Sequence, residues 1–341
     1  MKINREKLVG ILSAIKPGLS KKAIVEQATH FIITGEEILT YNDQICIVYP
    51  FKTDFSCSIV AEEFYKILSG ITNEEVDLSF KNDKLHIEAL GLDAGLVVDT
   101  GLDILDMVDK LDIERMRKKT KSLPKDFLEA INLCIFSASK DATNPAYTCL
   151  LLEDQYIAST DGFRISEYKM KSSMDCSILV PAISVMELVK FKVVEMALAP
   201  KSSWVYFFTE DGICFCSRLV IADFPDYIRV LKGFDSTEIV FPKDLKRMIE
   251  TASILAEGEL NQDKEVGIRI EKGKFRVKGQ NAKGWVESEK KFEYKEDPIS
   301  FIINPFFLNK ILDHTQSMFY GEGKILFKDT SFKHVISLGA K

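Results

Sequence analysis

An internal repeat limits what this chain can fold into more than any other feature of its sequence. Leu123–Leu128 and Phe241–Lys246 lie 118 residues apart, and in both segments Pro-Lys-Asp stands between apolar residues. Apolar residues at helical spacing follow each segment, and proline suits the first position of a helix, where its missing N–H is not needed. We therefore predict that both segments open an amphipathic helix of one repeated unit.

The same helix signal recurs at shorter intervals along the whole chain. Pro181 and Pro305 also precede amphipathic runs, and two runs without proline begin near Asn4 and Ala61. The expected helix starts, near residues 4, 61, 124, 181, 242 and 305, are 57 to 63 residues apart. The chain therefore consists of six half-repeats with one helix each.

The sequence between these helices alternates apolar and polar residues, which predicts strands. Hairpins are expected over residues 30–41, 147–159 and 266–278. Pairs of half-repeats then form three similar α+β units, each with two helices packed on antiparallel sheets. We expect domains over residues 1–121, 122–236 and 237–341, joined by connections over residues 100–122 and near 232–237. The first connection ends in a basic run at residues 114–121, so we expect it to be a partly solvated linker.

The composition is that of an ordinary globular protein and excludes the fibrous and disordered classes. The 341 residues are 46% apolar and 28% charged, with a formal net charge of -6. No apolar run reaches the roughly 18 residues that span a bilayer, and residues 1–7 lack the apolar core of a signal peptide. We expect a cytoplasmic protein without a membrane partner. The acidic balance argues against binding nucleic acid with the whole surface, although one basic face is compatible with it.

Motifs for catalysis or metal binding are missing from the sequence. It contains no Walker loop, G-x-S-x-G elbow, H-E-x-x-H pair or dinucleotide fingerprint. The four histidines, at positions 30, 86, 314 and 334, are scattered, which favours structural roles for them. The seven cysteines lie mainly in apolar stretches, so we expect buried, reduced thiols. We predict no enzyme activity, no cofactor and no metal.

Two local sequences stand out in the second unit. Ala158–Ser166 reads Ala-Ser-Thr-Asp-Gly-Phe-Arg-Ile-Ser and contains a strong turn signal. Asp223–Leu231 reads Asp-Phe-Pro-Asp-Tyr-Ile-Arg-Val-Leu and surrounds a proline with aromatic and aliphatic residues. Each alone is compatible with an ordinary turn or packed connection. Together with the triplication, the two stretches resemble the bacterial-type DNA sliding clamp, the β subunit of the replicative DNA polymerase III holoenzyme.

This resemblance covers essentially the whole chain and implies both a fold and a function. It implies three DNA-clamp domains per chain and a head-to-tail homodimer closed into a ring, with helices lining the hole and strands outside. Such a clamp is not an enzyme. It would encircle double-stranded DNA as a processivity factor, be loaded by an ATP-driven clamp loader, and tether the replicative DNA polymerase and other clamp-binding repair or replication proteins.

The resemblance also implies a partner-peptide site between the second and third domains, where family partners insert a short, largely apolar peptide. The residues at matching positions are Tyr147, Thr160, Gly162, Phe163, Arg164, Ile165, Pro225, Arg229, Val230, Val335 and Ser337. Apolar walls would supply burial, and an arginine would orient the peptide. Phe163 replaces the histidine that is usual in the family, and residues 335–341 lack its Met-Pro-Met-like ending. We therefore expect a different partner preference.

The six predicted helices carry a slight excess of positive charge. Their formal charges sum to +2, whereas the rest of the chain carries -8. This sign suits helices that face phosphate in a ring, although few counterions would be released. We predict weak, salt-sensitive binding of DNA through Arg5, Lys16, Lys21, Lys22, Lys190, Lys192, Lys246 and Arg247.

Two other functions are compatible with the sequence. A clamp-like regulator or decoy that has lost loading or ring closure would share the architecture, and the weaker resemblance of the first hundred residues and the altered tail suggest it. A cytosolic cysteine-dependent enzyme is a distant alternative, because no base accompanies any cysteine.

Overall fold

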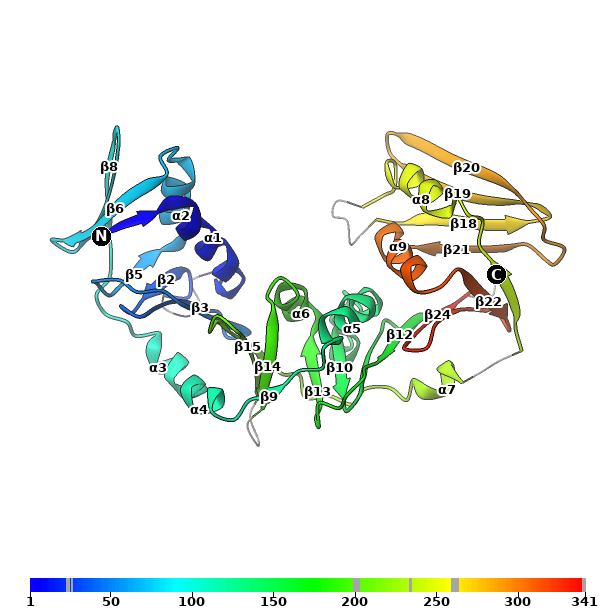
Figure 1. Cartoon of the computed structure of the whole chain (residues 1–341), viewed down its shortest axis with the longest axis horizontal. Coiled ribbons are helices and arrows are strands. Elements are labelled where there is room, and N and C mark those ends of the chain that lie inside the picture. The colour runs from blue at the N-terminus through cyan, green and yellow to red at the C-terminus, as the bar shows by residue number, and fades with distance from the viewer. Residues whose placement is uncertain (23–24, 26, 199–202, 233–234, 259–263, 339–341) are drawn as a thin grey trace. The chain divides into compact units, whose positions relative to one another are not determined.

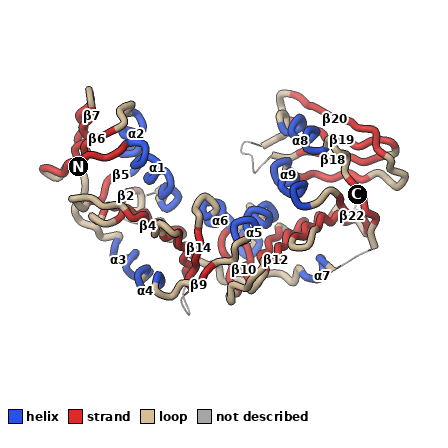
Figure 2. Tube along the Cα trace, viewed as in Figure 1, coloured by secondary structure: helices blue, strands red, loops and turns tan. Residues whose placement is uncertain are grey.

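The computed structural model describes residues 1–22, 25, 27–198, 203–232, 235–258 and 264–338, which form an α+β fold with antiparallel sheets (Figures 1 and 2). The predicted fold class is confirmed. The chain divides into two compact units, one made of residues 1–125 and 180–220 and the other of residues 126–179 and 221–341. The expected middle domain is thus shared between both units, because the strands of its two halves join different sheets.

The first unit contains a four-stranded sheet with the order β1-β6-β7-β8 and an eight-stranded sheet with the order β5-β2-β3-β4-β16-β15-β14-β9. Its strands are β1 (Lys2–Asn4), β2 (His30–Ile33), β3 (Glu37–Tyr41), β4 (Ile45–Pro50), β5 (Cys57–Val60), β6 (Glu75–Lys81), β7 (Lys84–Ala89), β8 (Leu92–Val97), β9 (Lys121–Ser122), β14 (Val193–Leu198), β15 (Trp204–Thr209) and β16 (Cys214–Arg218). Its helices are α1 (Arg5–Ile15), α2 (Ala61–Gly70), α3 (Leu105–Val108), α4 (Ile113–Arg117) and α6 (Ala182–Leu188).

The second unit repeats this plan with an eight-stranded sheet of order β13-β10-β11-β12-β24-β23-β22-β17 and a four-stranded sheet of order β20-β19-β18-β21. Its strands are β10 (Cys149–Glu153), β11 (Tyr156–Thr160), β12 (Arg164–Lys169), β13 (Ser177–Pro181), β17 (Thr237–Val240), β18 (Val266–Glu271), β19 (Gly273–Asn281), β20 (Gly284–Phe292), β21 (Ile299–Ile303), β22 (Ser317–Gly321), β23 (Lys324–Lys328) and β24 (Phe332–Ser337). Its helices are α5 (Phe127–Cys134), α7 (Ile228–Leu231), α8 (Leu245–Ser253) and α9 (Pro305–His314).

Each eight-stranded sheet runs without a break across an expected domain boundary. In the first unit β4 pairs with β16, so that Ile47 lies opposite Phe215. In the second unit β12 pairs with β24, so that Ile165 lies opposite Val335. Both pairings are antiparallel, and both join the third strand of one half-repeat to the third strand of another. Backbone hydrogen bonds therefore connect half-repeats that are far apart in the sequence.

The six predicted helices are all present, as α1, α2, α5, α6, α8 and α9. Only Pro305 stands in the first turn of its helix, whereas Pro181 is the residue before α6. Pro124 and Pro242 lie three residues before α5 and α8. The prediction that helices begin at these two prolines is therefore wrong. The Leu245 N–H donates to the Pro242 carbonyl at 3.0 Å, so the Pro-Lys-Asp segment forms a turn that leads into the helix.

The predicted hairpins are formed by β2 and β3, β10 and β11, and β18 and β19. One strand is shorter than predicted. Pro145–Thr148 form a 3₁₀ turn, so β10 begins at Cys149 and Tyr147 precedes it. The Asn144 side chain caps this turn by accepting from the N–H of Ala146 at 3.2 Å.

The connection over residues 100–122 is more than the solvated linker that its charges suggest. It forms α3 and α4 and buries Ile104, Val108, Leu111 and Met116 in one core with residues of β15 and β16. Even the basic run takes part, because the Arg117 guanidinium carbon lies 4.9 Å from the centre of the Phe208 ring. The residues of β15 and β16 that pack against this connection are distant from it in the sequence, so local patterns did not predict the packing. The second predicted connection, near residues 232–237, lies partly outside the described residues.

Among the described residues, no helix combines the length and the apolar character needed to cross a membrane.

Candidate functional site

The turn between β11 and β12 is held in one conformation by its own polar groups. Thr160 Oγ1 donates to the Arg164 carbonyl at 2.8 Å and accepts from the Gly162 N–H at 3.0 Å. The Asp161 carboxylate accepts from the N–H groups of Phe163 and Arg164, both at 2.9 Å. Gly162 has a φ of +91°, which side chains disfavour. These hydrogen bonds hold the backbone of the turn, and 76% of Phe163 is exposed.

Two further candidates flank this turn. Arg164 Nε donates to Asp161 Oδ2 at 2.8 Å, which fixes the direction of the guanidinium group. The ring of Tyr147 lies against the turn, because a Cβ built on Gly162 would be 3.4 Å from Tyr147 Cε2. An aromatic ring and a charged, oriented donor thus both belong to the surroundings of this turn.

Strand β24 brings the candidates from the end of the chain to the same place. Ile165 lies opposite Val335, and both side chains are buried. The Ser337 N–H donates to the Phe163 carbonyl at 2.8 Å, and Ser337 is exposed. Val335 therefore packs in the buried layer under the site with Ile165, whereas Ser337 lies at the surface of the site.

The segment that contains α7 is anchored on this sheet by a buried tyrosine. Tyr227 is 6% exposed, and burial together with the Glu167 carboxylate raises its pKa. Helix α7 also packs against β24. Arg229 lies at the surface with its Nε 2.9 Å from Asp226 Oδ2. The two other candidates of this segment, Pro225 and Val230, are partly buried.

Two residues of this region were missed by sequence reasoning. Ile228 on α7 is 56% exposed and adds an apolar side chain next to Arg229. Its position inside the Asp223–Leu231 stretch was a signal, but sequence alone does not distinguish an exposed isoleucine from a buried one. Glu167, the buried partner of Tyr227, had no signal in the sequence.

A buried histidine lies beneath the site and links its two strands. His334 Nδ1 lies 2.8 Å from the Ser166 hydroxyl and 3.4 Å from the Ser137 hydroxyl. Burial, and secondarily the positive charge of Arg164, lower the pKa of His334 to about 3. The histidine is therefore neutral at physiological pH and inaccessible, which agrees with the structural role expected for it.

The predicted DNA-binding residues differ in how accessible they are. Six of them are exposed: Lys21, Lys22, Lys190, Lys192, Lys246 and Arg247. The other two belong to helix α1 and its end. Lys16 Nζ lies 3.0 Å from the centre of the Tyr65 ring. The Arg5 side chain is only 16% exposed, and its Nε donates to the Asn73 carbonyl at 3.1 Å. Arg5 therefore holds the start of α1 in place.

The cysteines lack the features of catalytic thiols. Six of the seven are buried, and Cys176 is partly exposed. Burial raises the pKa of Cys57 to about 12 and that of Cys149 to about 11. A buried thiol that holds its proton is a poor nucleophile. Within the described ranges, no cluster of three or more histidine, cysteine or acidic side chains has the arrangement of a metal site.

The arrangement of six half-repeats in antiparallel sheets that cross the expected domain boundaries defines a class, the DNA sliding-clamp fold. Its similarity to solved structures extends over the full chain. The DnaN sliding clamp (DNA polymerase III subunit beta) from Bartonella birtlesii, bound to griselimycin, aligns with a TM-score of 0.75 and 15% identity over 100% of this chain and 99% of that chain.

Two further structures give the same result. The DNA polymerase sliding clamp from Pseudomonas aeruginosa aligns with a TM-score of 0.72 and 16% identity over 100% of this chain and 99% of that chain. The Helicobacter pylori beta clamp bound to a DNA ligase peptide aligns with a TM-score of 0.72 and 14% identity over 100% of both chains. No protein-family model matches the sequence, and no curated protein sequence matches it significantly. These comparisons confirm the fold that the sequence resemblance implied.

Proposed function

We propose that this protein is a DNA sliding clamp, a non-enzymatic processivity factor that encircles duplex DNA and tethers the replicative polymerase and other clamp-binding proteins. The observation that carries the proposal is the full-length agreement in fold with solved clamps. The half-repeats correspond to three domains over residues 1–121, 122–236 and 237–341. A clamp loader would place the ring on DNA in the cytoplasm.

The sheet edges support closure of the ring by a second copy of this chain. Each of the three repeats has two halves, and each half has a helix followed by three strands. In each eight-stranded sheet, the third strand of the first half of one repeat pairs with the third strand of the second half of the next repeat, as β4 does with β16 and β12 with β24. Strands β8 and β20 are the remaining third strands, and each is the edge of a four-stranded sheet. Antiparallel pairing of β8 with β20 of another copy repeats the same junction and yields a head-to-tail homodimer.

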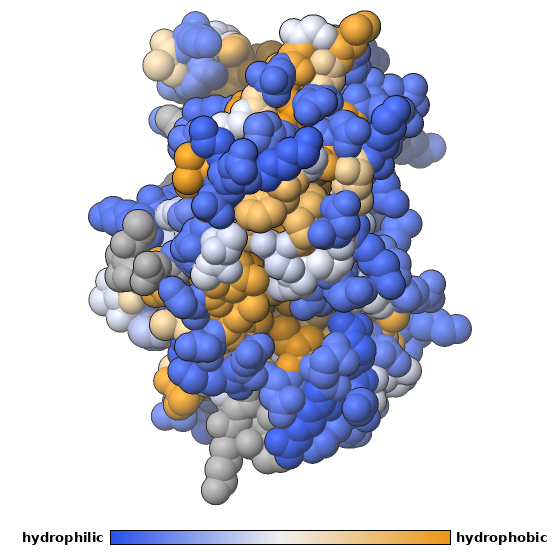
Figure 3. All heavy atoms as spheres, turned by 90° about the vertical axis from the view of Figure 1, so that its left-hand side faces the viewer, coloured by the Kyte–Doolittle hydropathy of each residue, from blue (hydrophilic) through white to orange (hydrophobic). Residues whose placement is uncertain are grey.

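Apolar side chains accompany both open edges. Val97 on β8 is 71% exposed, and Trp285 on β20 is 65% exposed. Ile254, at the end of α8, is 73% exposed, and α8 packs against β20. Figure 3 shows the side of the molecule on which β8 lies in Figure 1, and apolar surface is exposed there between hydrophilic side chains. Exposed apolar residues at a sheet edge favour burial in an interface.

The charges favour weak, sliding contact with DNA. Two of the exposed basic residues, Lys190 and Lys246, are already paired with Glu187 and Asp313. Few phosphate contacts therefore remain for each chain, so direct affinity for DNA should be weak, with a salt dependence set by those few contacts. Retention on DNA would depend on enclosure rather than on tight binding of the backbone.

Release from cut DNA tests the proposal. The protein is loaded onto nicked circular DNA with the clamp loader and ATP of its host, and the circle is then linearised. We expect co-elution with the circle and loss from the linear form. Binding that survives linearisation would exclude retention by enclosure.

A clamp-like regulator or decoy is the alternative that the same assay separates. Such a protein would not be retained on circular DNA, and native mass measurement would give a monomer of 38.6 kDa rather than a dimer. The first unit nevertheless contains a complete set of half-repeat elements, with α1, α2 and β1 to β8. This completeness favours a functional clamp.

A further inference from the structure

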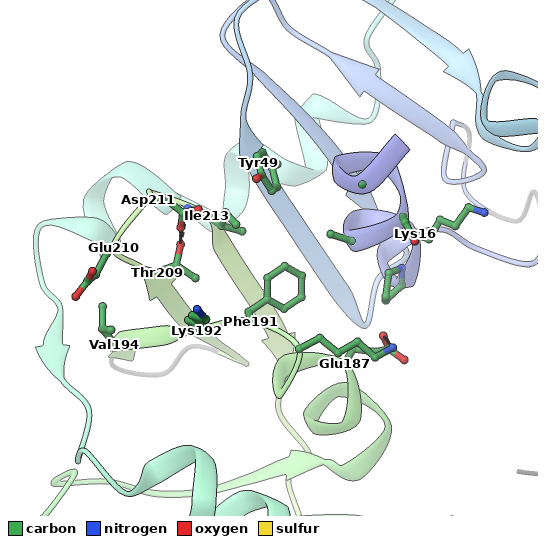
Figure 4. A pocket seen from close by; sticks show the side chains of 15 residues that line it. Lys16, Tyr49, Glu187, Phe191, Lys192, Val194, Thr209, Glu210, Asp211 and Ile213 are labelled. Atoms are coloured by element: carbon green, nitrogen blue, oxygen red, sulfur yellow. Dashed lines mark hydrogen bonds and ion pairs between the residues drawn. The ribbon is translucent and has the colours of Figure 1, made fainter. Parts of the chain in front are cut away.

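A cavity of about 1120 Å³ opens between α1 and α6 within the first unit (Figure 4). Its walls come from the second half of α1, the end of α6 and the residues after it, the end of β4 and the turn between β15 and β16. Side chains that face such a space lack packing partners across it. The two helices are therefore less firmly joined here than in a close-packed interior.

The second unit contains the corresponding pair of helices, α5 and α9, and the two pairs can be compared position by position. Leu8 on α1 and Phe127 on α5 are each followed by buried residues three, four and seven places later. Val185 on α6 and Leu308 on α9 each have buried residues three places before and three places after them. Positions on α1 and α6 therefore correspond to positions on α5 and α9 through these residues.

An aromatic contact joins the helices of the second unit and is missing from the first. Phe136, just after α5, and Phe307 on α9 stack with ring centres 4.9 Å apart. Their counterparts in the first unit are Pro17 and Ser184. Pro17 lines the cavity. Smaller side chains thus stand in the first unit where two stacked rings join the helices in the second.

Two polar contacts of the second unit are also missing from the first. Lys310 on α9 donates to Asn132 on α5 at 3.2 Å. One turn further, His314 Nε2 on α9 lies 3.5 Å from Glu129 Oε1 on α5. The counterparts in the first unit are Glu187 and Ser13 for the first contact, and Phe191 and Gly10 for the second. All four counterparts line the cavity, so the space lies where these contacts would be.

The polar side chains beside the cavity are bound on their own side of it. Glu187 at the end of α6 pairs with Lys190, and Lys16 at the end of α1 lies over the Tyr65 ring of α2. Of the residues in α1 and α6, all of which the structure describes, none forms a hydrogen bond or an ion pair with the other helix. The two helices can therefore change their separation without breaking a polar contact between them.

The opposite face of the same sheet is closely packed. Cys46 on β4 lies opposite Cys216 on β16, and both pack in one core with the connection over residues 100–122. Phe215 alternates with Cys216 along the strand and so points to the other face, where its ring lies 5.6 Å from that of Phe191 beside the cavity. The pairing of β4 with β16 thus has a packed core on one face and an open space on the other.

We propose that the first unit contains a hinge. Its two half-repeats bend about the β4–β16 pairing, so that α1 and α6 approach and separate, whereas the contacts between α5 and α9 hold the corresponding junction of the second unit. Bending of the first unit narrows or widens the cavity, but the same motion in the second unit breaks an aromatic stack and two polar contacts. Hinges lie where few contacts resist the motion. This inference goes beyond the proposed function, because it concerns the deformation of one chain with or without DNA.

Distances between pairs of spin labels test the hinge in the full chain. The labels are attached to p-acetylphenylalanine, so the seven cysteines stay unmodified. One protein carries labels in place of Lys52 and Lys190, on the two half-repeats joined in the first unit, and another carries them at the counterparts in the second unit, Lys171 and Asp313. All four residues are exposed. Double electron–electron resonance then gives the distribution of each distance, and an excess of unlabelled protein removes distances between chains.

We expect a broader distribution for the pair in the first unit than for the pair in the second. Exchange of one polar contact between the units assigns the difference to the helices. Ser13→Asn combined with Glu187→Lys gives the first unit the contact of the second and should narrow its distribution towards that of the second pair. The matched change, Asn132→Ser combined with Lys310→Glu, should broaden the distribution in the second unit.

Equal widths for the two pairs in the unmodified chain would overturn the proposal. A first distribution that stays equally broad in the folded Ser13→Asn, Glu187→Lys variant would overturn it too. Thermal unfolding shows whether this variant is folded, and Pro17→Phe, which adds a ring to the cavity wall, replaces it if it is not. None of these outcomes depends on retention on circular DNA, so the hinge and the clamp proposal can fail separately.

Discussion

Truncation of Phe163 should separate partner binding from folding. The side chain is 76% exposed, so Phe163→Ala is expected to change the free energy of unfolding by less than about 0.5 kcal/mol. Ile165 stands two residues further along β12 and is 8% exposed. Ile165→Ala is expected to destabilise the fold by about 2 to 5 kcal/mol, because it removes a buried side chain. Phe163→Ala should therefore leave stability unchanged, whereas Ile165→Ala should lower it.

The effect of Phe163→Ala on binding follows from the exposed area. A phenylalanine offers about 200 Å² of surface, of which 76% corresponds to about 150 Å² in this turn. At about 25 cal/mol per Å², complete burial against a partner contributes about 4 kcal/mol, and burial of half contributes about 2 kcal/mol. The second figure corresponds to a loss of affinity of about 30-fold.

Fluorescence anisotropy with a labelled peptide from the tail of the replicative polymerase measures this loss. Thermal unfolding of both variants provides the folding control, and Ile183→Ala on α6 is a matched change at another exposed apolar residue, 59% exposed. Unchanged peptide affinity in Phe163→Ala, with Arg164→Ala equally without effect, would refute the site assignment.

Three further perturbations test other parts of the account. Val97→Glu on β8 should convert a dimer to a monomer in native mass measurement, whereas Ile183→Glu, away from the sheet edges, should not; a dimer in both would exclude closure through β8. His334 has a pKa of about 3 in the fold and about 6.5 when unfolded, so its contribution is fully present above pH 6.5 and is lost as the pH falls from 6.5 towards 3. Between pH 6.5 and 4 this amounts to roughly 3 kcal/mol, and His334→Gln should flatten the fall in denaturant titrations; an equal slope would contradict the linkage. Lys246→Gln combined with Arg247→Gln should weaken DNA binding at low salt and lower the salt slope by about one to two, and an unchanged slope would remove these residues from the DNA-facing surface.

Much of the fold was predictable because its signals are local. Helix positions follow from apolar residues at helical spacing, such as Leu8, Ile11 and Leu12 on α1, all of which are buried. The turn at Gly162 follows from the short-range preferences of Thr-Asp-Gly. The two prolines misjudged as helix starts, Pro124 and Pro242, show the limit of such signals, because a proline also suits the turn before a helix.

The candidate partner site was accessible to sequence reasoning only through its two motifs. Their approach to each other depends on the pairing of β12 with β24, which joins residues 164–168 to residues 332–336. Tyr227 completes the site by inserting beside Glu167, a contact between residues that no local pattern relates.

The sequence by itself determined the repeat, the fold class and the identity of the turn at Gly162, since helical spacing, strand alternation and turn residues are patterns that can be read from the sequence without knowing which segments meet in space. Only the tertiary structure decided that Arg5 is committed to Asn73, that residues 104–116 belong to the core, and that a cavity separates α1 from α6. The physical reason is that burial depends on side chains brought together from distant half-repeats. The same helix pattern therefore closes over Phe136 and Phe307 in one unit and stays open beside Pro17 in the other.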